Sequence, residues 1–106
     1  MGCCACGNYI ITKAHVKDYS ECLKEGISNH EYLNIVELCY NCHYNYFDQG
    51  KMGIVKLNSK YHFVIINDNN EIESIESKHM INVLEENIRW KNLKCKPRLW
   101  KTLFAR

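Results

Sequence analysis

The N-terminal half of the chain alternates between short apolar runs and longer polar ones. Residues 9–16 are rich in β-branched and aromatic side chains and predict a strand. Residues 18–33 are polar and contain several turn-forming residues, so we expect a loop there, with a helical turn at 19–25. A second short strand is expected at 35–38, followed by a helix at 40–48 that stops near a glycine.

The middle of the chain has the pattern of a small antiparallel hairpin or meander. Strands are expected at 53–57, 61–67 and 71–75, where β-branched and aromatic residues concentrate. The first two are joined by Asn58-Ser59-Lys60, and the last two by the turn signal Asp68-Asn69-Asn70.

The C-terminal segment predicts a helix over residues 78–92. Ser77 can cap its first turn. Met80, Leu84 and Ile88 recur every four residues, which places them on one apolar face that we interpret as core.

These elements predict an α+β fold in a single domain, 1–106, since a chain of 106 residues supports one modest core. Within it we distinguish residues 1–50, a β segment at 51–76, and a helix with a basic tail at 77–106. The apolar runs are far shorter than the roughly 18 residues that a membrane span needs. No signal peptide is visible, so a cytoplasmic location is expected.

Seven cysteines are many for this length, and their spacing favours a metal over disulfides. Cys3 and Cys6 form one C-x-x-C pair, and Cys39 and Cys42 form another. Two such pairs in one small domain predict a structural zinc with four thiolate ligands. Cys4 in place of Cys3 is the alternative, with the less usual spacing C-x-C.

The formal charge of +2 conceals an asymmetry along the chain. Residues 1–86 carry a net charge of −5, whereas residues 87–106 carry +7 and no acidic residue. Such a basic end is expected where a chain meets phosphate, although a solvated helix end has the same composition. The candidate nucleic-acid contacts are Lys91, Lys94, Lys96, Arg98, Lys101 and Arg106.

One constellation of residues suggests a specific chemistry. His15 lies in T-K-A-H-V, and residues 34–43 read N-I-V-E-L-C-Y-N-C-H, from Asn34 to His43. With the two cysteine pairs, this pattern resembles the HNH endonucleases, whose centre is called the ββα-metal motif. The resemblance covers about residues 3–50 and extends loosely toward restriction-type members.

The resemblance implies a role for each residue and a small zinc-stapled ββα-metal domain. His15 corresponds to the general base, and Asn34 to the residue that fixes the neighbouring loop and the orientation of that histidine. His43 corresponds to the ligand of a catalytic Mg²⁺ or Mn²⁺ ion. The implied activity is hydrolysis of DNA phosphodiester bonds, by a homodimer or as part of a larger nuclease.

One position departs from the family pattern. Many HNH enzymes carry an acidic metal ligand just before the first histidine, where this chain has Ala14. Asp48 and Asp18 are the candidates to supply the missing oxygen. Asp48 follows His43 by five residues, however, and on a helix it need not face the same way, so a helix-end contact is equally expected.

The remaining histidines and lysines carry weaker signals. His30, His62 and His79 are each interpreted as surface or packing residues. Three lysines flank the expected site and can meet either phosphate or solvent: Lys13, Lys17 and Lys51.

Two other functions compete with the endonuclease. A zinc-stabilised DNA-binding module that lacks catalysis is the main alternative, with Ala14 as its support. An RNA-binding or structural zinc ribbon explains neither His15 nor Asn34.

Overall fold

The computed structural model describes residues 2–94, and side chains as far as Asn92. A two-stranded sheet pairs β1 (Thr12–His15) antiparallel with β2 (Ile35–Leu38), so that Thr12 lies opposite Leu38 and His15 opposite Ile35. The connection between them contains α1 (Tyr19–Lys24). The expected strand at 35–38 and the helical turn near 19–25 are confirmed, whereas the first strand is shorter than 9–16.

A three-stranded antiparallel sheet follows in the order β3 (Met52–Leu57), β4 (Lys60–Ile66) and β5 (Ile72–Glu76). Asn58 and Ser59, between β3 and β4, both have positive φ, at 51° and 67°. Two left-handed residues in a two-residue loop match the right-handed twist of the flanking strands. The predicted meander is therefore confirmed, with boundaries shifted by about one residue.

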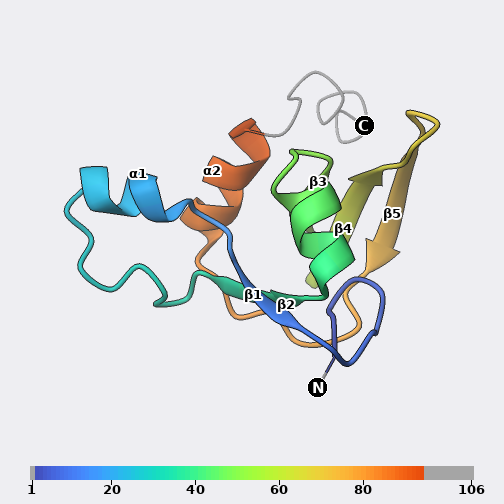
Figure 1. Ribbon diagram of the computed structural model, residues 1–106, viewed down its shortest axis with the longest axis horizontal. Helices are drawn as coiled ribbons and strands as arrows, with labels where there is room; N and C mark the ends of the chain where they lie inside the picture. The colour runs from blue at the N-terminus through green and yellow to red at the C-terminus, as the bar shows by residue number, and fades with distance from the viewer. Residues whose placement is uncertain (1, 95–106) are drawn as a thin grey trace.

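The helix that follows β2 is η1 (Asn41–Phe47), a π-helix rather than an α-helix. It contacts β1, β2 and β3, and Figure 1 shows it standing between the two-stranded sheet and the three-stranded sheet. The largest side chains of the core lie fully buried around it: Leu38, Phe47, Met52, Ile54 and Phe63. The helix therefore joins the two sheets into one core.

The last helix, α2 (Glu85–Lys94), begins seven residues later than the predicted start at 78. Residues 77–84 instead run as an extended segment that is bonded to distant parts of the chain. The amide of Lys78 donates to the carbonyl of Cys4 (2.7 Å), and that of Leu84 donates to the carbonyl of Leu33 (3.0 Å). These long-range bonds hold the backbone in a non-helical conformation, with a bend at Lys78 and His79, where the local sequence favours a helix.

The predicted apolar face and cap of this helix are wrong for the same reason. Met80 is 94% exposed, whereas Ile81 and Val83 are buried, which is the two-residue alternation of an extended segment. Ser77 donates its hydroxyl to the carbonyl of His79 (2.6 Å) and caps no helix. Ile88 alone keeps its expected place in the core. No helix among the described residues is long and apolar enough to cross a membrane.

Candidate metal centre and catalytic site

The two C-x-x-C pairs meet in space. The sulfur atoms of Cys3, Cys6, Cys39 and Cys42 all lie within 4.8 Å of one another, and those of Cys6 and Cys39 are 3.5 Å apart. A tetrahedral zinc ion with Zn–S bonds of about 2.3 Å holds its sulfurs about 3.8 Å apart. The four thiols, none of which is in a disulfide, can therefore hold a metal ion such as zinc.

The backbone is folded to favour thiolates in this cluster. The amide of Cys6 donates to the sulfur of Cys3 (3.4 Å), and that of Cys42 donates to the sulfur of Cys39 (3.5 Å). The two pairs thus form two equivalent knuckles. Cys4 lies outside the cluster and is buried. Of the two alternatives left open by the sequence, the structure places Cys3 in the cluster.

The pKa values of two thiols in the cluster, Cys3 and Cys42, are shifted in opposite directions. Burial raises the pKa of Cys3, but hydrogen bonds from backbone amides, that of Cys6 first, outweigh burial and bring it to about 7. Burial, and then the hydrogen bond with the Cys39 thiol, raises the pKa of Cys42. Four thiolates this close repel one another, so a cation is needed before all four can lose their protons.

We expect one tightly bound zinc ion per chain, and loss of that ion together with a markedly lower melting temperature in Cys39→Ser. Metal binding contributes directly to folding in small domains, because the unfolded chain has no preformed site. Elemental analysis and thermal unfolding check this. Cys4→Ser is the matched control, since it removes a buried neighbouring thiol and should keep the zinc. A Cys39→Ser protein with full zinc content would contradict the assignment.

His43 is held in one orientation by β1. Its Nδ1 lies 2.6 Å from the hydroxyl of Thr12, and that hydroxyl donates its proton to the carbonyl of Leu38 (2.8 Å). Because the hydroxyl has only one proton, Nδ1 of His43 must be the donor to Thr12. Tyr44 stacks on the imidazole, with ring centroids 4.1 Å apart. The other nitrogen, Nε2, is therefore free to bind a metal or a proton.

The π-helix brings Asp48 to this nitrogen. The amide of Asp48 donates to the carbonyl of His43 (2.8 Å), five residues earlier, which is the hydrogen bond that defines a π-helix. A carboxylate oxygen of Asp48 consequently lies 3.4 Å from Nε2 of His43. In an ordinary α-helix these two side chains would point in different directions, whereas in the π-helix they lie beside each other.

The pair of His43 and Asp48 has the donor set of a cation site. A lone pair on Nε2 and a carboxylate oxygen at this distance repel each other unless a cation or a proton lies between them. Neighbouring ligands of an octahedral ion with bonds of 2.0–2.1 Å are about 3 Å apart, which these atoms approach within a few tenths of an ångström. Asp48 and Asp18 also line the same hollow, of about 420 Å³, together with Lys91.

Asn34 acts on the backbone rather than directly on His15. It is 2% exposed, accepts a hydrogen bond from the amide of Lys17 (2.7 Å), and donates to the carbonyls of Lys17 (2.9 Å) and His30 (2.8 Å). These three bonds fasten the end of β1 to the loop that precedes β2. The contact expected between Asn34 and His15 is thus replaced by an indirect one through that loop.

The loop places His30 against His15. Nε2 of His15 lies 3.0 Å from Nδ1 of His30, and Tyr19 packs edge-on against the His30 ring with centroids 4.4 Å apart. The interpretation of His30 as a surface or packing residue missed this contact. No local pattern signals it, because it depends on how Asn34 closes a loop of about 16 residues.

His15 is suited to accept a proton. Burial lowers its pKa, and the nearby charges of His30 and then His43 lower it further, although Glu31 and Asp18 oppose the shift. His15 is therefore neutral at neutral pH. His43 contributes less to this lowering of the pKa than burial and His30 do.

Lys91 is not available to a nucleic acid. It is 6% exposed, its ammonium donates to the carbonyl of Phe47 (2.6 Å), and it lies 4.1 Å from the centroid of the Phe47 ring. Its placement corrects the prediction of a phosphate contact at this residue. The side chain of Lys94, and Lys96, Arg98, Lys101 and Arg106, lie outside the described part of the chain. Lys17 forms an ion pair with Glu25.

We expect Lys91→Met to lower the free energy of unfolding by about 1–3 kcal/mol, because a charged donor bonded to a buried carbonyl is lost. DNA affinity of the folded variant and its dependence on salt should not change. Chemical denaturation and a binding titration at several salt concentrations check both points. Arg89→Met is the control, since it removes an exposed cation from the same helix. A flatter salt dependence in Lys91→Met alone would show that Lys91 does reach phosphate.

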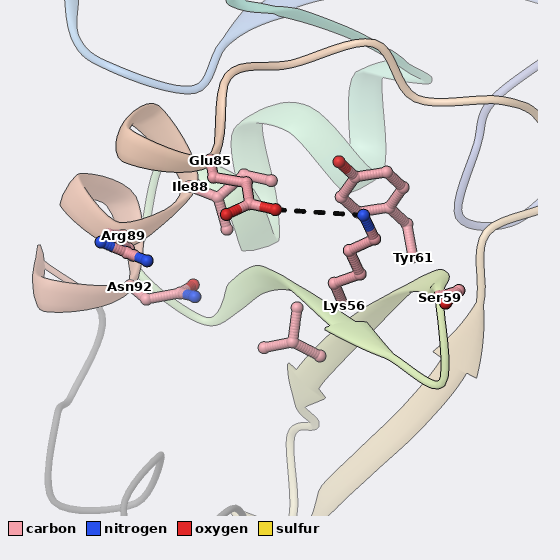
Figure 2. A pocket seen from close by; sticks show the side chains of 8 residues that line it. Lys56, Ser59, Tyr61, Glu85, Ile88, Arg89 and Asn92 are labelled. Carbon is pink, nitrogen blue, oxygen red and sulfur yellow. Dashed lines mark ion pairs between the residues drawn. The ribbon is translucent and has the colours of Figure 1, made fainter.

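A cavity of about 530 Å³ lies on another part of the molecule, between α2 and the β3–β4 hairpin. Figure 2 shows Lys56 and Glu85 facing each other across it, with an ion pair of 3.9 Å. Neither the cysteine cluster nor the histidines described above line this cavity. No protein-family model, curated protein or solved structure matches this chain.

Proposed function

We propose that the chain is a metal-dependent endonuclease of the ββα-metal type that hydrolyses phosphodiester bonds in DNA. The observation that carries the proposal is the pairing of His43 with Asp48, whose Nε2 and carboxylate oxygen are 3.4 Å apart. The element order β1, β2 and η1 supports it, as does the four-cysteine cluster, which could hold zinc and which ties the segment before β1 to the start of η1.

The catalytic cation would be held by Nε2 of His43 and the carboxylate of Asp48, and Asp18 lines the same hollow as Asp48. A bound Mg²⁺ or Mn²⁺ supplies charge stabilisation for the phosphate and for the leaving 3′ oxygen. Thr12 keeps the proton of His43 on Nδ1, so that Nε2 presents its lone pair to this position.

His15 would take the proton of the attacking water. Its Nε2 is engaged with His30, so the nitrogen that faces the water is Nδ1. A base needs a lone pair on that nitrogen, which requires the proton of neutral His15 to reside on Nε2 and to be donated to Nδ1 of His30. A His30 ring that accepts at Nδ1 would thereby favour the tautomer of His15 that can act as a base. Asn34 supports this arrangement by holding the His30 backbone.

DNA would be contacted by the basic C-terminal end of the chain. With Lys91 buried, the proposed contacts are Lys94, Lys96, Arg98, Lys101 and Arg106. Such contacts give affinity and position the duplex but do not read its sequence.

His15→Ala should reduce cleavage by roughly 10²- to 10⁴-fold, the usual effect of losing a general base, while zinc content and DNA binding are kept. A plasmid-nicking assay with and without Mg²⁺ measures this. His62→Ala, at a histidine of β4, is the matched control and should cleave normally. Cleavage at the wild-type rate by His15→Ala would mean that the base lies elsewhere.

Asp48→Asn should raise the Mn²⁺ concentration for half-maximal cleavage by at least 10-fold, since even the loss of an outer partner of a metal ligand costs roughly 10- to 100-fold in affinity. A Mn²⁺ titration of the cleavage rate measures the change. Asp68→Asn, which removes a carboxylate from the exposed β4–β5 turn, should leave the titration unchanged. An unaltered metal requirement in Asp48→Asn would exclude this residue as a ligand.

The competing function is a DNA-binding module without catalysis, and one observation favours it. Ala14 is completely buried in β1, so the position that carries an acidic ligand in many HNH enzymes faces the core in this chain. A protein that binds DNA but shows no cleavage with either Mg²⁺ or Mn²⁺ would select this alternative.

A further inference from the structure

A second group of metal-ligating side chains surrounds the base. Ligand atoms of His15, His30 and Glu31 all lie within 4.8 Å of one another. We propose that these three residues form a binding site for a transition-metal ion such as Zn²⁺, Co²⁺ or Ni²⁺, distinct from the cysteine cluster, and that an ion bound there blocks the base. The blocking effect rests on the proposed nuclease function, whereas the binding does not.

The chemistry of the three donors favours such ions over Mg²⁺. Two imidazoles and one carboxylate are the ligand set of open zinc sites, which leave a fourth position for water. Mg²⁺ prefers an octahedral shell of oxygens, which this group does not provide. Two nitrogens on one tetrahedral zinc ion, at 2.0–2.1 Å, are about 3.3 Å apart. The observed 3.0 Å between His15 and His30 is within a few tenths of an ångström of that value.

The fold already holds the two histidines of this group together. His15 is fixed by the pairing of β1 with β2, and the backbone of His30 is fixed by the side chain of Asn34. Tyr19 packs against both histidine rings, with centroids 4.4 Å from His30 and 6.4 Å from His15. Little conformational entropy of the two imidazoles therefore remains to be lost when an ion binds.

Binding at this site would disable the base through its tautomer. A metal ion bonds to Nε2 of His15 in place of the hydrogen bond to His30, so the single proton of the neutral ring must move to Nδ1. That nitrogen then has no lone pair for a water molecule. The ion would thus take the place of the proton that the active tautomer carries on Nε2, and it would leave the ring in the inactive tautomer.

The binding is tested by adding Co²⁺ to the zinc-loaded protein and recording visible absorption, with calorimetry for the affinity. Co²⁺ on nitrogen and oxygen ligands lacks the thiolate charge-transfer bands that would mark exchange into the cysteine cluster. The wild type should bind Co²⁺ at this site, His30→Gln should bind it at least 10-fold more weakly, and Glu31→Gln should also bind it more weakly. His62→Gln and Asp48→Asn should retain the site, which separates it from the position beside His43.

The blocking effect is tested by adding Zn²⁺ to Mn²⁺-supported cleavage, with each variant compared with its own rate without zinc. Zinc should inhibit the wild type, and Glu31→Gln should need about 10-fold more zinc for the same inhibition. Co²⁺ binding that is identical in wild type, His30→Gln and Glu31→Gln would overturn the site itself. Binding without inhibition would overturn the blocking effect. A wild type that never cleaves DNA would refute the nuclease proposal, while the Co²⁺ titration would still decide the site.

Discussion

The four-cysteine cluster is the constraint on which the N-terminal half depends. A sheet of two four-residue strands buries too little apolar surface to be stable alone, so its ends must be fastened in another way. The cluster joins residues 3–6, which precede β1, to residues 39–42, which begin η1. That junction sets the helix against the sheet and brings His43 to Thr12. The cysteine cluster that could hold a metal and the orientation of the candidate catalytic histidine are therefore consequences of one arrangement.

The π-helix supplies a carboxylate, which the sequence immediately before His15 lacks. With Ala14 buried in β1, no carboxylate precedes the first histidine. The wider turn of η1 places a residue five positions after His43 beside it, and that residue is Asp48. π-Helical turns are uncommon and occur frequently at functional sites. We interpret the irregular turn as the means by which this chain supplies a carboxylate from the helix instead of from the strand.

Features set by local sequence could be predicted, and features set by long-range contacts could not. The meander was predictable because Asn58 and Ser59 tolerate the left-handed conformations of a tight hairpin, and the cysteine spacing identified the cluster. The start of α2 could not be predicted, because hydrogen bonds from the amides of Lys78 and Leu84 to distant carbonyls override the helical propensity of this segment. The three-way bonding of Asn34, and with it the placement of His30 on His15, likewise arises only when the loop closes.

The three proposed metal sites differ in the softness of their ligands, and this difference determines which ion suits each site. Four thiolates suit a structural zinc ion, whereas the carboxylate of Asp48 beside His43 suits Mg²⁺ or Mn²⁺, whose shell is completed by further oxygen ligands. The neighbouring imidazoles of His15 and His30 suit borderline ions, which the cysteine cluster could also hold. Because four thiolates bind zinc far more tightly than two imidazoles and a carboxylate, scarce zinc fills the structural cluster first. Zinc would reach the base only when it is in excess, so the order of affinities allows one ion to stabilise the fold and, at higher concentration, to oppose its activity.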